Sequence, residues 1–223
     1  MPIENLGHEY EFEPQYGLPE RLPSDEHVLW QGAPDVRTLA ASAFHLRKLA
    51  LYFGLLVLAC AWPALQSGEG VIAVLHAVKW IVPLSLTGLV CVWTLAWMTA
   101  RTTVYTVTNK RIVMRLGIVL TVSFNLPFKR IAAADIRALE DGFGDISLAL
   151  QGDDRIAWVH LWPSVRPWHI NQPQPTLRAI ADVQMVAAHV RDAWSQATGI
   201  QAKPAAQPSS GRPGVADLQV SPL

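Results

Sequence analysis

LALYFGLLVLACAWPAL at residues 49–65 and WIVPLSLTGLVCVWTLAWMTA at residues 80–100 are two stretches without a charged residue or a histidine. As α-helices they would be about 26 and about 32 Å long, and the hydrocarbon core of a bilayer is about 30 Å thick. A helix satisfies all of its own backbone polar groups, as any segment inside lipid must. The two stretches therefore predict a pair of membrane-spanning helices, a hairpin over residues 47–100.

The residues beside these stretches predict the orientation of the hairpin. Arg47 and Lys48 directly precede the first stretch and Arg101 directly follows the second, whereas Lys79 is the one basic residue of the connector. Basic residues beside membrane spans stay in the cytoplasm. We therefore expect both chain termini to be cytoplasmic. The start of the second helix stays open, because the apolar residues 71–78 could lengthen it or lie along the outer interface.

Composition restricts the classes of partner. The chain is 51% hydrophobic and 16% charged, and its formal net charge is zero, so no nucleic-acid partner is expected. Residues 1–46 hold eight acidic and two basic side chains, which predicts an acidic cytoplasmic N-terminal arm. This arm could contact the mildly basic segment 101–197, or both could be ordinary solvated surfaces.

After residue 101 the pattern changes to short β-branched and aromatic runs separated by turns. It predicts strands at 102–108, 111–116, 118–126, 131–139, 144–150 and 155–161. Apolar residues then recur every three or four positions, which predicts one amphipathic helix over 176–197. Residues 198–223 are rich in proline and small residues and are expected to be disordered.

These elements together predict an α+β membrane protein. A two-helix transmembrane hairpin is followed, over residues 101–197, by an antiparallel β-barrel that one C-terminal helix caps. This is the plan of a pleckstrin-homology-like (PH-like) domain, which we expect on the cytoplasmic side.

Catalytic and cofactor motifs are missing from the sequence. It contains no Walker loop, no G-x-S-x-G and no clustered Cys and His, so we expect no enzyme, no metal and no cofactor. His45 and His76, near opposite ends of the hairpin, are weak candidates for pigment ligands. A lone histidine at such a position is more often a hydrogen-bonding residue.

Two surfaces are candidates for binding. The proline-rich loop 162–175 carries Trp162, Arg166, Trp168 and His169, and aromatic and arginine side chains are typical interface anchors. Alternatively, its tryptophans fill the barrel or pack at the membrane. The inner rim of the hairpin is the second surface. There Phe44, His45 and Arg47 are candidates for partner binding, and Lys48, Arg101, Lys110 and Arg111 for lipid headgroups.

A family resemblance rests on six segments. YTVTNKRIVMRLG at 105–117 resembles the first hairpin of bacterial PH-like domains that follow a membrane hairpin. The others resemble the PuhB family of photosynthetic-complex assembly proteins from purple bacteria: EFEPQYGLPERLP at 11–23, VLWQGAPD at 28–35, AFHLRKLALYF at 43–53, FNLPFKRIAAAD at 124–135 and LWPSVRPWHINQPQPTL at 161–177.

The resemblance implies a role in assembling the photosynthetic reaction centre in the cytoplasmic or intracytoplasmic membrane. The expected partners are the reaction-centre H subunit or the other core subunits, together with membrane lipids. Two alternatives stay open: a general PH-like scaffold or lipid-sensing protein and, less favoured, a bacteriochlorophyll carrier. A homodimer is also compatible with the sequence.

Overall fold

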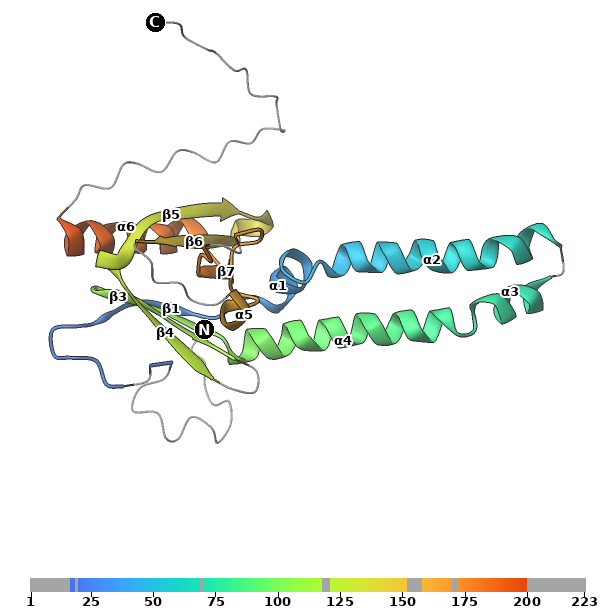
Figure 1. The fold of residues 1–223 in the computed structure, drawn as a ribbon, viewed down its shortest axis with the longest axis horizontal. Coiled ribbons are helices and arrows are strands. Elements are labelled where there is room, and N and C mark those ends of the chain that lie inside the picture. The colour runs from blue at the N-terminus through green and yellow to red at the C-terminus, as the bar shows by residue number, and fades with distance from the viewer. Residues whose placement is uncertain are drawn as a thin grey trace, which may run out of the picture.

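The computed structural model describes residues 17–18, 20–68, 70–117, 121–151, 158–169 and 172–199. A long helical hairpin projects from a domain of two β-sheets and a C-terminal helix (Figure 1). Residues 1–16 of the predicted arm and the predicted disordered tail from residue 200 lie outside the described residues.

The hairpin consists of α2 (Leu46–Gln66) and α4 (Ile81–Thr102), with the short helix α3 (Val71–Val78) at its tip (Figure 1). Both long helices are long and apolar enough to cross a membrane. Gly88 of α4 faces the Phe53 ring of α2, and a Cβ at Gly88 would lie in ordinary van der Waals contact with that ring, at 3.5 Å. Most of their large apolar side chains point outward and are exposed. α3 is a separate helix, so residues 71–78 do not extend α4.

The strands form two antiparallel sheets. The first has the order β1 (Val28–Gly32), β2 (Val104–Thr108), β3 (Arg111–Leu116) and β4 (Val122–Pro127). The second has the order β5 (Ile131–Ala138), β6 (Gly144–Leu150) and β7 (Thr176–Ile180). Strand pairing among the described residues does not join the two sheets into the predicted closed barrel.

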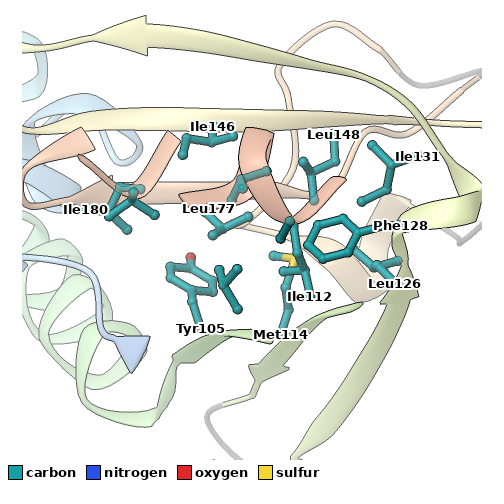
Figure 2. Close-up of a cluster of buried hydrophobic side chains, with 14 of the residues drawn as sticks. Tyr105, Ile112, Met114, Leu126, Phe128, Ile131, Ile146, Leu148, Leu177 and Ile180 are labelled. Carbon is teal, nitrogen blue, oxygen red and sulfur yellow. The ribbon is translucent and has the colours of Figure 1, made fainter. Parts of the chain in front are cut away.

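One apolar core fills the space between the sheets and the C-terminal helix α6 (Val183–Thr198). Tyr105, Ile112 and Met114 from the first sheet lie close to Ile146 and Leu177 from the second (Figure 2). Each such side chain contributes about 1.5–3 kcal/mol when it is fully buried. The core therefore joins the two sheets and α6 into one unit, and it fixes the positions of the loops at the two ends of the domain.

The predicted arm is partly a component of this domain. β1 pairs with β2, with Trp30 opposite Val107, although its sequence was assigned to the arm. It is followed by α1 (Val36–Ser42), which begins where the Asp35 carboxylate accepts the Thr38 N–H at 2.8 Å. The arm was predicted from the acidic composition of residues 1–46. A five-residue segment has too little periodicity to predict a strand within it.

Two further elements differ from the sequence prediction. Residues 176–180 form strand β7, because Leu177 lies opposite Ile146 in β6, and the helix begins only at Val183. The backbone of Ala179 and Asp182 has positive φ, which interrupts a helix. In the predicted strand at 155–161, Trp158–Leu161 forms a helical turn, α5, and residues 155–157 lie outside the described residues.

Candidate functional site

The end of the domain that joins the hairpin, here called the hairpin root, consists of residues 44–48, 97–103 and the segments in contact with them. Phe44, just before α2, packs edge-on against Trp162, with ring centroids 5.5 Å apart. The turn between β5 and β6 also lies here, since the Arg47 guanidinium is 3.4 Å from the Glu140 carboxylate. The predicted partner residues Phe44, Arg47 and Trp162 are therefore brought together.

Residues 162–169, here called the Trp168 loop, are held in one conformation by the strand that follows. The Thr176 N–H donates to Ser164 O at 2.9 Å, and the Arg166 N–H donates to Gln174 O at 3.0 Å. The Arg166 guanidinium also donates to the Asp135 carboxylate at 2.8 Å. The loop is thus attached to both β7 and β5.

Trp168 lies on this loop with 93% of its surface exposed. Trp168 therefore does not fill the core, as the alternative for the loop tryptophans would require. Trp162 is about half exposed and packs against Phe44. Trp168 has φ 65°, an uncommon conformation for a bulky residue. The next residue is fixed locally, with His169 Nδ1 3.0 Å from Pro167 O. The loop therefore presents a large apolar side chain to its surroundings.

A buried polar network lies under the Trp168 loop. Arg178, only 4% exposed, donates from Nη2 to Val165 O at 2.6 Å. The Tyr105 hydroxyl, on the strand that follows α4, is 2.9 Å from Ser164 Oγ and accepts the Arg178 N–H at 3.3 Å. Burial raises the pKa of Tyr105 and lowers the pKa of Arg178. The sequence did not single out Tyr105 and Arg178, because Tyr105 is typical of a strand and Arg178 falls on the polar face of the helix predicted over 176–197.

The predicted lipid contacts divide into two groups. Lys48 is exposed at the hairpin root, and Arg101 lies over the Trp97 ring, 5.1 Å from its centroid. Lys110 and Arg111 lie beyond the far end of β2, a strand of five residues and so about 17 Å long. The structure therefore removes Lys110 and Arg111 from the rim.

At that far end, here called the distal end, the acidic N-terminal segment meets the basic β2–β3 turn. Lys110 forms an ion pair with Asp25, and Arg111 Nε is 2.7 Å from the Glu26 carboxylate. The Lys110 ammonium, mainly through its hydrogen bond, lowers the pKa of Asp25. The charge distribution of the sequence left open whether the acidic arm contacts the basic segment. The two do meet, at this turn.

The two candidate pigment histidines lie far apart. His45 is exposed just before α2, and His76 is exposed in α3 at the tip of the hairpin. The 21 residues of α2, about 32 Å of helix, separate them. Across the described part of the chain no group of three or more His, Cys, Asp or Glu residues could hold a metal ion.

A family model described as "Bacterial PH domain" matches residues 43–194, which include the hairpin, strands β2 to β7 and most of α6 but not β1. The chain belongs to the bacterial PH domain family. In this bacterial PH domain protein the matched region begins at Ala43, so it includes residues 44–48 and 97–103 of the hairpin root but neither β1 nor α1.

This bacterial PH domain protein is also similar to known proteins. An uncharacterized 23.7 kDa protein in the puhA 5′ region of Rhodobacter capsulatus is 35% identical over 210 residues, which cover 92% of this chain and 95% of the relative. That match agrees with the resemblance to PuhB-like proteins. A DUF1696-family protein with a pleckstrin-homology domain from Shewanella loihica is 14% identical, with a TM-score of 0.27, over 40% of this chain and 69% of its own.

Proposed function

We propose that this protein is a non-enzymatic, membrane-anchored assembly factor that binds subunits of the bacterial photosynthetic reaction centre while the complex is built. The observation that carries the proposal is the relative in the puhA 5′ region, which matches this chain over almost its whole length. The bacterial PH domain is compatible with binding, and the sequence contains no recognised catalytic motif.

In this proposal α2 and α4 cross the cytoplasmic or intracytoplasmic membrane. The outward-facing apolar side chains of both helices support insertion, because lipid is the solvent in which such a surface is stable. Arg47, Lys48 and Arg101 all lie at the hairpin root, beside the domain. Since basic flanks stay inside, the PH-like domain and both termini are cytoplasmic.

The Trp168 loop is the surface that captures the partner. A tryptophan on a loop whose backbone is already tied down buries a large area in an interface, and the loop itself loses less conformational entropy than an unattached one. The Asp135 and Gln174 contacts of Arg166 restrict the loop before any partner arrives. The partner in this proposal is the H subunit or another core subunit of the reaction centre.

Deletion of the gene, followed by complementation with variants, tests this proposal. We expect the deletion to lower the reaction-centre absorbance of isolated membranes. Trp168→Ala should fail to restore it and should weaken copurification of reaction-centre subunits about tenfold or more, as loss of an interface anchor does. Trp80→Ala is the matched control, because Trp80 is 77% exposed next to α3, at the other end of the hairpin.

Both variants should accumulate to the wild-type level, because neither side chain belongs to the core. Normal reaction-centre yield in the deletion strain would contradict the assembly role and would favour a general scaffold or lipid sensor. Full restoration by Trp168→Ala would retain the role but move the binding surface elsewhere.

A further inference from the structure

Two arginines that sequence reasoning left out lie at the hairpin root. Arg137 is near the end of β5, just before the turn whose Glu140 contacts Arg47. Figure 1 shows that end of β5 directed toward the hairpin. The Arg137 side chain is exposed on β5, opposite Asp145 of β6 and three residues before Glu140, so its positive charge lies at this end of the domain.

Arg37 reaches the root through α1. The Asp35 N–H donates to Ala179 O at 2.9 Å, which ties the start of α1 to the end of β7. Leu39 is buried with Ala100 near the end of α4, so α1 lies against that helix. Arg37, two residues before Leu39 and therefore on the opposite face of α1 from α4, is exposed.

The acids at this end form their direct contacts with groups other than these arginines, and the charge of the buried Asp145, opposite Arg137, acts on the buried Arg178. Asp35 caps α1, Asp145 accepts the Ala179 N–H at 2.9 Å and Glu140 is held by Arg47. Neither Arg37 nor Arg137 forms an ion pair with any residue that the structure describes. The exposed charges that remain there among the described residues are Arg37, Lys48, Arg101 and Arg137 against Asp141 and Asp182.

We propose that the hairpin root is a docking surface for anionic phospholipid headgroups, with Arg37 and Arg137 as contacts in addition to Lys48 and Arg101. The inference rests on the proposed function, because the root lies at the headgroups only if α2 and α4 cross the bilayer. Arg101 over Trp97 is an arrangement suited to that depth, where aromatic rings collect and basic side chains meet phosphates. Binding would fix the domain, and its Trp168 loop, close to the membrane surface.

Native mass spectrometry of the full-length protein, released from nanodiscs of equal phosphatidylglycerol and phosphatidylcholine, tests the inference. The wild type should retain phosphatidylglycerol in excess. Arg37→Gln and Arg137→Gln should each lower that preference about fivefold, the equivalent of about 1 kcal/mol for one basic residue at an anionic surface. Arg37→Lys should keep most of it, because the charge remains.

Lys129→Gln is the matched control, since it removes one exposed positive charge from the distal end, and it should leave the preference unchanged. A double variant of Arg37 and Arg137 with the wild-type preference would overturn the inference. Alkaline extraction of membranes separates this failure from failure of the anchoring proposal. A chain that is released overturns both, whereas a chain that stays and shows no lipid preference overturns the lipid surface alone.

Discussion

The two ends of the PH-like domain carry the same kinds of residue in opposite arrangements. At the distal end Lys110 and Arg111 pair with Asp25 and Glu26, and their charges serve to hold the N-terminal segment in place. At the hairpin root Arg37 and Arg137 are exposed and have no ion-pair partner among the described residues. A basic residue is available to an anionic ligand only where the fold leaves it without an acid.

Burial separates the Arg111–Glu26 pair of the distal end from the Arg47–Glu140 pair of the root, whereas the Lys110–Asp25 pair is exposed. The Glu26 side chain is 3% exposed and accepts both Arg111 Nε at 2.7 Å and Thr108 Oγ1 at 2.8 Å. The Arg47 and Glu140 side chains are 78% and 83% exposed. Removing one partner of a buried pair leaves an uncompensated charge, whereas water replaces the partner of an exposed one.

The largest effect is expected for Glu26→Ala. It should lower the free energy of unfolding by about 3 kcal/mol, because Arg111 and Thr108 lose their common acceptor. Thermal unfolding of the full-length protein in detergent, followed by the near-ultraviolet circular dichroism of the domain, measures it. Glu26→Gln keeps an acceptor oxygen and should cost less. Unchanged melting in Glu26→Ala would show that the distal contact does not stabilise the domain.

Tyr105→Phe should have the next largest effect, a loss of about 1–2 kcal/mol, because Ser164 and the Arg178 N–H lose a buried partner. Burial raises the pKa of Tyr105 above 10.0. The contribution of Tyr105 to the free energy of unfolding is therefore fully present below pH 10 and is lost as pH rises through the folded pKa. Unfolding measured between pH 8 and 11 should therefore show an alkaline loss of stability that is smaller in the variant. The same loss in both proteins would assign it to another group.

Arg47→Ala should change the free energy of unfolding by less than about 0.5 kcal/mol, because both members of its ion pair are exposed. Arg111→Ala is the matched control at the distal end, and it should cost several times more since Glu26 is buried. Parallel thermal melts of the two variants make the comparison. Equal losses would mean that burial does not distinguish the two ends.

The smallest effect is a titration at the distal end. The Asp25 carboxyl should titrate below its ordinary pKa of 3.8, and Lys110→Met should move that pKa back toward 3.8. A lowered pKa contributes stability above pH 3.8 that is lost as pH falls through the folded value. Carbon-detected NMR of the Asp25 carboxyl follows both titrations. An unshifted pKa in the wild type would show that the Lys110 contact is not maintained in solution.

The parts of the fold that sequence reasoning predicted are those whose pattern is local. The bounds of β3 and β6 agree with the expected strands, because turns on both sides end them. β7 was assigned to a helix, since Leu177, Ile180 and Val183 also fit a helical spacing. Only the pairing of Leu177 with Ile146 distinguishes the strand, and that contact joins residues far apart in the chain.

The candidate site divides in the same way. The sequence indicated that Trp162, Arg166 and Trp168 share a rigid loop, because prolines and large aromatic residues are adjacent there. It gave no sign of the buried Arg178 beneath the loop, and it grouped Lys110 with Arg101 because both follow the hairpin. Strand β2 carries Lys110 away from the root, a separation that depends on the direction of the chain.

By itself the sequence determined that the chain contains two apolar helices, that a β-rich domain with a C-terminal helix follows, and that the chain resembles PuhB-like proteins. Each of these conclusions depends on the composition of contiguous residues, so it can be drawn without knowing which residues are in contact. Only the tertiary structure decided which charges are neutralised, which tryptophan is exposed and which arginines lie beside the hairpin. Those properties depend on side chains from distant segments, brought together by strand pairing and a common apolar core.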